Sequence, residues 1–153
     1  MQLILIAILS LGLITTGLDL MRNTTTTSPT LPATQSDPFI RFLITLNKVE
    51  ASGETNPPPG DNGTAIGPFQ IHHAYWQDAV QTQPELLEPP GYQACTNWDY
   101  AGQIVKAYML RYVPLAVASN NLETLARTHN GGPEGAQKDS TLIFWLKFQN
   151  QLN

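Results

Sequence analysis

Apolar residues recur at helical spacing directly after Asp37 and Pro38. Asp caps free backbone amides well and Pro fits the first helical turn, so this dipeptide marks a helix start. The apolar positions that follow at helical spacing are Phe39, Ile40, Leu43, Ile44 and Leu46. The pattern predicts a helix that runs to about Ala51 and stops near Gly53. Glu50 then lies on its last turn and faces inward.

The same periodicity predicts four further helices, over residues 72–80, 97–112, 122–128 and 142–152. Three consecutive prolines at 57–59 exclude helix and lead into a turn at residues 61–63. Residues 64–66 are expected to form a short strand, which is one side of a small hairpin beside a cleft. Residues 83–91 contain three prolines and are expected to be a loop.

The N-terminal part of the chain has a different composition. Residues 3–18 are almost unbroken apolar, which is longer than a usual signal-peptide core and slightly short for a membrane span. Residues 1–21 are therefore expected to be a cleaved signal peptide or an uncleaved signal-anchor, and both alternatives stay open. Residues 22–36 are rich in Thr, Ser and Pro and are typical of a linker. We expect residues 37–153 to form an exported domain, either secreted or anchored to a membrane through residues 3–18.

Composition and charge narrow the function classes. The chain has 153 residues, which suggests one domain, and its net charge of −4 gives no electrostatic reason to bind nucleic acid. Cys95 is the single cysteine, so an internal disulfide and a cysteine-rich metal site are excluded, and a small buried residue is expected there. His72 and His73 are adjacent, and His129 lies far along the chain, a spacing that does not suit zinc. We expect no metal and no cofactor, and the sequence does not indicate the oligomeric state.

Glu50 and Asp61 are the candidate catalytic residues. Glycoside hydrolysis needs one protonated carboxyl group and one ionised carboxylate, held in environments that separate their pKa values. Burial and the negative end of a helix dipole both raise the pKa of a carboxyl group such as that of Glu50, whereas Asp61 follows a polar loop. Glu50 is therefore predicted to be the acid and Asp61 the nucleophile or stabiliser. Two such acids are common by chance, and Glu54 is a rival acid that is expected to lie in solvent beyond the helix.

Five other residues are candidates for substrate binding. Gly67 either lets the backbone approach a sugar or forms a tight turn with Pro68. Gln70 either bonds to the substrate or packs. Tyr75 lies on a predicted helix, where an aromatic ring either stacks on a sugar or joins the core. His129 either lines the cleft or braces the loop that follows it, and Asn130 begins a bend with exposed amides.

Several short motifs resemble the invertebrate-type lysozyme family and similar bacterial and phage lysozyme-like domains. They are Gly-Pro-Phe-Gln-Ile at 67–71, Tyr-Trp at 75–76, the Val-x-x-Tyr-Met-x-Arg-Tyr segment at 105–112 and His-Asn-Gly-Gly-Pro-Glu-Gly at 129–135. The family's acid precedes a Ser-Gly pair, and here Glu50 is followed by an extra Ala51 before that pair. Asp61 matches the family's second acid. Because animal members are disulfide-dense, the single cysteine favours the cysteine-poor bacterial or viral relatives.

The resemblance implies a lysozyme-like α+β fold, mainly α, with several helices, a small β-hairpin and a substrate cleft. It also implies a peptidoglycan β-1,4-N-acetylmuramidase of the retaining type, in which Glu50 protonates the glycosidic oxygen and Asp61 stabilises the intermediate. Peptidoglycan, or a related N-acetylated glycan, is then the partner. Two alternatives stay open. One is a lytic transglycosylase that uses Glu50 alone, and the other is a peptidoglycan-binding module without catalysis.

Overall fold

The computed structural model describes residues 37–87 and 91–152. Within these residues the chain is mainly helical, as predicted. The α-helices are α1 (Pro38–Ala51), α2 (His73–Thr82), α3 (Trp98–Tyr112), α4 (Pro114–Ser119), α5 (Leu122–Gly131) and α6 (Leu142–Asn150). The short 3-10 helices are η2 (Asp61–Gly63), η3 (Pro84–Leu87), η4 (Gly91–Thr96), η5 (Gly135–Gln137) and η6 (Asp139–Thr141). The predicted leader and linker lie outside the described residues.

Helix α1 begins and ends where the sequence predicts. The Asp37 carboxylate accepts a hydrogen bond from the Phe39 amide at 2.8 Å, and Ser52 ends the helix in the left-handed conformation. Phe42 and Leu46 are fully buried on the inner face of the helix. The last turn, which carries Glu50, is therefore fixed by packing at one end of α1.

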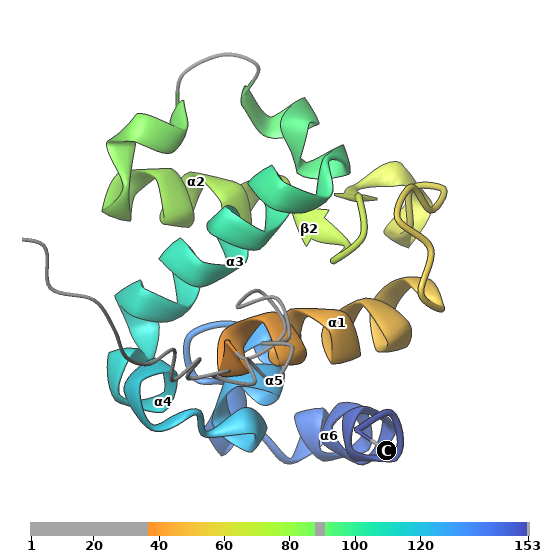
Figure 1. Ribbon diagram of the computed structural model, residues 1–153, viewed down its shortest axis with the longest axis vertical. Helices are drawn as coiled ribbons and strands as arrows, with labels where there is room; N and C mark the ends of the chain where they lie inside the picture. The colour runs from red at the N-terminus through yellow and green to blue at the C-terminus, as the bar shows by residue number, and fades with distance from the viewer. Residues whose placement is uncertain (1–36, 88–90, 153) are drawn as a thin grey trace, which may run out of the picture. The chain divides into compact units, whose positions relative to one another are not determined.

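A small antiparallel hairpin follows the proline-rich stretch. Strands β1 (Ala65–Ile66) and β2 (Ile71–His72) pair with Ala65 opposite His72 and Ile66 opposite Ile71. The tight turn between them contains Gly67 and Gln70, both with positive φ. The expected hairpin is confirmed, and in Figure 1 it lies beside the C-terminal end of α1.

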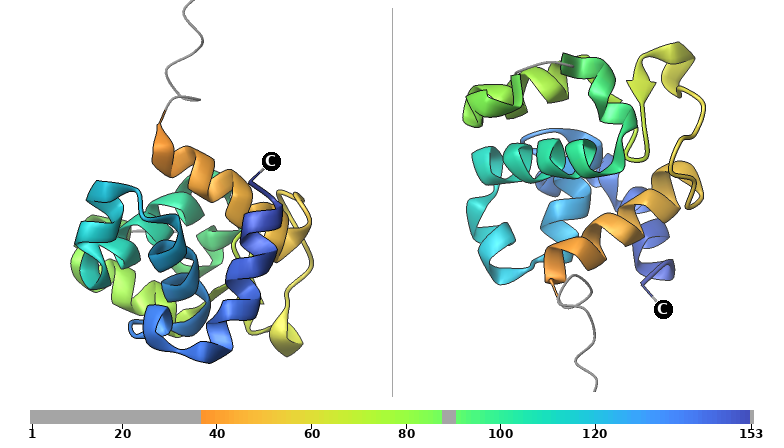
Figure 2. Two further views of the ribbon diagram at one scale, coloured as in Figure 1. Left: turned by 90° about the horizontal axis from the view of Figure 1, so that it is seen from below. Right: turned by 45° about the horizontal axis from the view of Figure 1, so that its top comes forward.

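The helices pack around one core. Helices α2 and α3 run side by side, while α5 and α6 pack against each other on the other side of α1 (Figures 1 and 2). Helices α1 and α3 approach closely where Gly102 faces Leu43, since a β-carbon at Gly102 would lie 3.1 Å from Leu43 Cδ1. The largest fully buried side chains include Phe42, Phe69, Ile104, Met109, Leu125 and Phe148.

Two local predictions are wrong, and one helix was missed. The expected loop over 83–91 contains η3, whose Leu86 is buried and whose Leu86 carbonyl accepts a hydrogen bond from the Tyr100 hydroxyl at 2.6 Å. Helix α4 was not expected, because its six residues give too few turns for a periodic pattern. Helix α5 continues to Gly131 and breaks at Gly132, rather than ending at Thr128.

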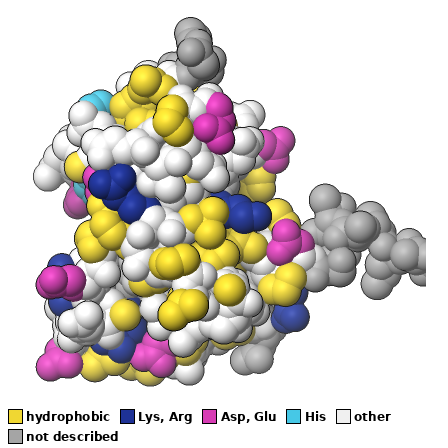
Figure 3. Space-filling view, turned by 90° about the vertical axis from the view of Figure 1, so that its left-hand side faces the viewer, with side chains coloured by type: hydrophobic (Ala, Val, Ile, Leu, Met, Phe, Trp, Pro, Cys, Tyr) yellow, Lys and Arg dark blue, Asp and Glu magenta, His cyan; other side chains and the backbone are white. Residues whose placement is uncertain are grey.

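On the face of the molecule drawn in Figure 3, hydrophobic side chains lie between acidic and basic side chains, and both signs of charge are interspersed. Among the described helices, none has the length and apolar character needed to cross a membrane. The apolar segment 3–18 lies outside the described residues.

Candidate active site

Glu50 is a largely buried carboxyl group at the end of α1. Its side chain is 19% exposed. Burial raises the pKa of Glu50 from 4.5 to about 7; Lys147 on α6 acts to lower it and Asp61 acts to raise it further. The side chain therefore keeps its proton through mildly acidic pH, as a general acid must.

Asp61 has the opposite environment. It begins the short helix η2 with a positive φ of 51° and its side chain is 74% exposed. Its Oδ2 lies 3.1 Å from Nε2 of His72 on β2. This contact holds an exposed carboxylate at the edge of the hairpin.

The two carboxyl groups line one polar cleft of about 320 Å³. The groups around them come from the hairpin and from the end of α5. The other residues that line the cleft are Ala65, Gln70, His72, His129 and Asn130. The proline-rich segment and the hairpin thus bring Asp61 to face the end of α1, so that both candidate acids reach the same space.

His129 lies behind Glu50 and connects three elements. Its Nε2 is 3.1 Å from the Phe69 carbonyl oxygen and 3.5 Å from Glu50 Oε1, while its Nδ1 is 3.2 Å from the Tyr75 hydroxyl. Burial lowers the pKa of His129 from 6.5 to about 4, although the hydrogen bond to Phe69 acts to raise it. The imidazole is therefore neutral at neutral pH, and its contact with Glu50 is not an ion pair.

The structure separates the residues predicted for substrate binding into two groups. Gln70, His129 and Asn130 line the cleft, whereas Gly67 and Tyr75 do not. Gly67 is buried, and a β-carbon there would lie 1.8 Å from the Cys95 carbonyl oxygen, so a close backbone contact explains this glycine. The Tyr75 hydroxyl points to His129, and its ring stacks on Tyr108 with 3.6 Å between centroids.

Glu54, the rival acid, is exposed and does not line the cleft. Its carbonyl oxygen instead accepts a hydrogen bond from Asn47 at 2.8 Å, and Asn47 also donates to the Pro68 carbonyl at 3.0 Å. Asn47 is buried and ties the end of α1 to the hairpin turn. Sequence reasoning missed Asn47, although a polar residue on the inner side of a predicted amphipathic helix was a usable signal.

Sequence reasoning also missed His72 as the partner of Asp61. Its only signal was its adjacency to His73, which was considered for metal binding alone. Cross-strand pairing brings His72 to the Asp61 side of the hairpin, and this depends on register. Within residues 37–87 and 91–152, no cluster of three or more His, Cys, Asp or Glu side chains could hold a metal ion.

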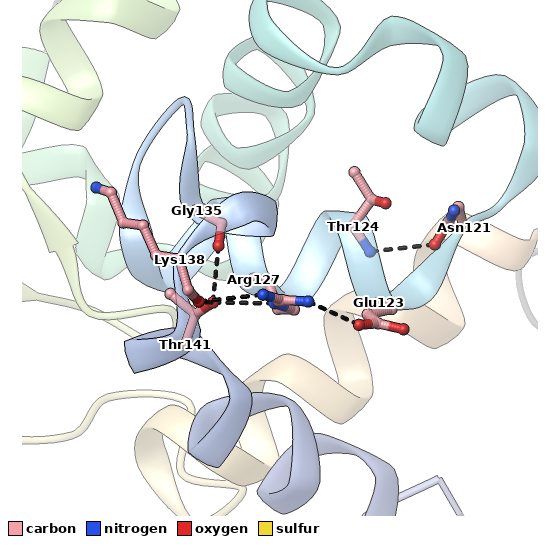
Figure 4. Close-up of polar contacts among 7 residues, drawn as sticks. All are labelled: Asn121, Glu123, Thr124, Arg127, Gly135, Lys138 and Thr141. Carbon is pink, nitrogen blue, oxygen red and sulfur yellow. Dashed lines mark hydrogen bonds and ion pairs between the residues drawn. The ribbon is translucent and has the colours of Figure 1, made fainter.

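The loop after His129 is held by a buried arginine. Figure 4 shows Arg127 reaching from α5 to Glu123 and to the segment that carries Lys138 and Thr141. Its guanidinium donates to the Thr141 hydroxyl at 2.9 Å, to the Glu123 carboxylate at 2.8 Å and to the Lys138 carbonyl at 3.0 Å. The Thr141 hydroxyl in turn lies 2.7 Å from the Gly135 carbonyl. These bonds fix the loop that follows the cleft residues of α5.

A mainly helical domain, with a short hairpin and a cleft between a buried glutamate and an exposed aspartate, is a lysozyme-like protein. The family model described as Destabilase matches residues 45–151. The chain therefore belongs to the destabilase family, and relatives of it are named invertebrate-type lysozymes. Lysozymes are glycoside hydrolases.

Two bivalve lysozymes illustrate the similarity. The lysozyme of Ostrea edulis is 36% identical over 112 residues, which covers 71% of this chain and 77% of the relative. The lysozyme of Magallana gigas is 42% identical over 91 residues, and this alignment covers 57% of the chain and only 60% of the relative. Relatives from bivalves and from Caenorhabditis elegans do not support the expected placement nearest to bacterial or viral proteins.

Solved structures agree with the fold. The crystal structure of Aeromonas hydrophila PliI in complex with Meretrix lusoria lysozyme matches with a TM-score of 0.59 and 31% identity, covering 72% of this chain and 87% of that one. The structure of Tapes japonica lysozyme matches with a TM-score of 0.57 and 30% identity, over 71% and 86% of the two chains. The expected lysozyme-like fold is confirmed.

Proposed function

We propose that this protein is a peptidoglycan hydrolase, a β-1,4-N-acetylmuramidase that uses Glu50 as general acid and Asp61 as nucleophile or stabiliser. The observation that carries the proposal is the contrast between the two carboxyl groups of one cleft. Burial raises the pKa of Glu50 to about 7, whereas the side chain of Asp61 is 74% exposed. The first group can hold a proton under conditions in which the second can attack or stabilise a cation.

The chemistry proceeds in two steps. Glu50 gives its proton to the glycosidic oxygen while the bond between this oxygen and the anomeric carbon breaks. Asp61 forms a bond to the anomeric carbon, or stabilises its positive charge, on the other side of the sugar. Water then attacks the anomeric carbon, Glu50 takes a proton from this water, and the bond to Asp61 breaks. Both carboxyl groups return to their starting protonation states.

Polar groups around the two carboxyls suit a glycan. Gln70 and Asn130 offer amide donors and acceptors, and the surface of the cleft is mainly polar. Gln70 is held in place by a hydrogen bond from its Nε2 to the Gly67 carbonyl at 3.0 Å. The names of the bivalve relatives, which are lysozymes, support peptidoglycan as the substrate class.

Digestion of purified peptidoglycan, followed by mass spectrometry of the products, tests the proposal. The wild-type protein should release muropeptides with ordinary reducing ends, and Glu50→Gln should lower the rate by about a hundredfold or more. Glu54→Gln is the matched control, because this carboxylate lies four residues further along and outside the cleft. It should digest like the wild type.

Other products would replace the proposal. Products lighter by one water, with a 1,6-anhydro end, would identify a lytic transglycosylase in which the sugar's own 6-hydroxyl attacks. Release of no product from several wall types, together with retained binding, would identify a peptidoglycan-binding module.

We also propose that the domain is exported, on the basis of the apolar segment 3–18. Expression of the full chain in a secreting host tests this. Mature protein in the medium that begins near residue 22 would identify a cleaved signal peptide. Full-length protein in the membrane fraction would identify an anchor, and protein confined to the cytoplasm would contradict export.

A further inference from the structure

His129 is not needed by the two-carboxylate mechanism, yet its imidazole is nearly enclosed. Its side chain is 4% exposed, and both ring nitrogens lie within 3.2 Å of a polar atom. The three groups that it contacts come from α1, from the hairpin turn and from α2. An imidazole with fixed neighbours on both nitrogens has a fixed tautomer.

The neighbours determine which tautomer is present. The Phe69 carbonyl oxygen can only accept a hydrogen bond, so Nε2, at 3.1 Å from it, carries the proton. Because the buried ring is neutral, Nδ1 is then an acceptor, and the Tyr75 hydroxyl donates to it at 3.2 Å. Burial raises the pKa of Tyr75 well above its ordinary value, so this hydroxyl keeps its proton. Stacking of Tyr75 on Tyr108, with 12° between the ring planes, holds the donor in place.

The same Nε2–H faces Glu50. Glu50 Oε1 lies 3.5 Å from Nε2, a close contact beside the hydrogen bond that Nε2 makes with the Phe69 carbonyl. A protonated carboxyl group that faces an N–H presents its carbonyl oxygen to it, because an O–H in that place would point its proton at the proton of the N–H. The proton of the acid then belongs on the other oxygen, Oε2.

We propose that His129, fixed as its Nε2–H tautomer by the Phe69 carbonyl and the Tyr75 hydroxyl, is a positioning residue that directs the Glu50 acid proton onto Oε2. This inference rests on the proposed function for its consequence in catalysis. Tyr75 acts through His129 and touches no reacting atom. Its hydroxyl donates to Nδ1 and so keeps the proton of the neutral ring on Nε2, on the side of the acid.

Other ionisable groups face this pair from each neighbouring element. Asp61 on η2 acts to raise the pKa of Glu50, and Lys147 on α6 acts to lower it. His72 on β2 acts to lower the pKa of His129 when it is charged. Tyr108 on α3 lies against Tyr75. A substitution that leaves these groups in place and removes only the Tyr75 hydroxyl isolates the contact with Nδ1.

Tyr75→Phe makes this change, and Tyr100→Phe is the matched control. The Tyr100 hydroxyl also makes two hydrogen bonds, with the Trp76 indole and the Leu86 carbonyl, but does not contact His129. Without the Tyr75 donor, the proton of the neutral ring can move from Nε2 to Nδ1. The Glu50 carboxylate then loses the N–H that faces it, so the alkaline limb of the pH–kcat profile should move to higher pH by about half a unit. Tyr100→Phe should leave the limb where it is.

Nitrogen-15 NMR of the imidazole in the full chain gives a readout that needs no substrate. The wild-type spectrum should show His129 protonated at Nε2 and unprotonated at Nδ1 from about pH 5 to about pH 8. An Nδ1–H tautomer in the wild type would overturn the inference, even if Tyr75→Phe failed to fold. An equal loss of kcat at every pH in Tyr75→Phe, with no shift of the limb, would also overturn it.

The two proposals fail differently. Full digestion by Glu50→Gln would refute the proposed function while leaving the tautomer and the carboxyl titration of Glu50 to be measured. A wrong tautomer, together with normal dependence of digestion on Glu50, would refute the role of His129 alone.

Discussion

Glu50→Gln should make the protein more stable at neutral pH while it removes activity. Burial raises the pKa of Glu50 from 4.5 to about 7, with the side chain only 19% exposed. The folded protein therefore binds this proton more tightly than the unfolded chain does. Gln has nearly the same size and no charge, so the substitution removes the linkage between folding and this proton.

Protonation in the two states sets the direction and the size of the effect. Below pH 4.5, Glu50 is protonated in the folded and the unfolded protein alike, so it adds no pH dependence. As the pH rises to about 7, the unfolded chain releases the proton first, and the free energy of unfolding falls. A difference of one pKa unit corresponds to about 1.4 kcal/mol, so the complete loss is about 3 kcal/mol.

His129 acts in the opposite direction over nearly the same range. Burial lowers its pKa from 6.5 to about 4, so its contribution is complete above pH 6.5 and is lost as the pH falls towards 4. In the wild type, the pH dependence from Glu50 and that from His129 oppose each other, so the free energy of unfolding changes little between about pH 4.5 and pH 6.5. Glu50→Gln leaves the His129 slope alone, so the variant should gain stability steadily as the pH rises.

Urea unfolding followed by tryptophan fluorescence, at a series of pH values, measures the difference. The free energy of unfolding of Glu50→Gln minus that of the wild type should grow by about 3 kcal/mol between pH 4.5 and a pH above 7. The exposed Glu54→Gln is the control and should follow the wild type throughout. A difference that is constant with pH would refute the raised pKa of Glu50, and with it the reason for assigning Glu50 as the acid.

Three further substitutions test other contacts. Gly67→Ala should lower the free energy of unfolding by about 3 kcal/mol, because a β-carbon there would meet the Cys95 carbonyl. Gly63→Ala has open space around the new β-carbon and should lower the free energy of unfolding by about 1 kcal/mol. Equal effects of the two substitutions would contradict this account. Arg127→Met should lower the free energy of unfolding, measured in urea, by about 3 kcal/mol, because the Thr141 and Lys138 acceptors lose a buried donor. An unchanged unfolding midpoint would show that the network is dispensable. Asp61→Asn should lower the rate of muropeptide release by about a hundredfold and change the free energy of unfolding by no more than about 0.5 kcal/mol. Full activity would favour the transglycosylase.

The position of Glu50 could be predicted because its signals are local. The Asp37 cap, the apolar period and the left-handed end of the helix all lie within 16 residues of chain. The partner of each candidate carboxyl group could not be predicted in the same way. Contact between Asp61 and His72 depends on the register of a two-residue pairing, and the contacts of His129 with Tyr75 and Phe69 span 54 and 60 residues.

Gly67 illustrates why a motif can be recognised before the contact that requires it is known. The sequence leaves two roles open for this glycine, approach to a sugar and a tight turn with Pro68. The structure adds a third, because the Cys95 carbonyl packs where a side chain would begin. Sequence periodicity carries no information about such a close approach between two irregular segments.

The region around Arg127 is held by hydrogen bonds and not by a disulfide. The chain has a single cysteine and therefore no internal disulfide. Arg127 donates to three groups on α5 and on the segment after it, and Thr141 closes the network onto Gly135 (Figure 4). A hydrogen bond to a charged group contributes about 1.5–3 kcal/mol, which is comparable with about 2–4 kcal/mol for a disulfide. Because Arg127 precedes His129 by two residues, this network also holds the end of α5 from which His129 reaches Glu50.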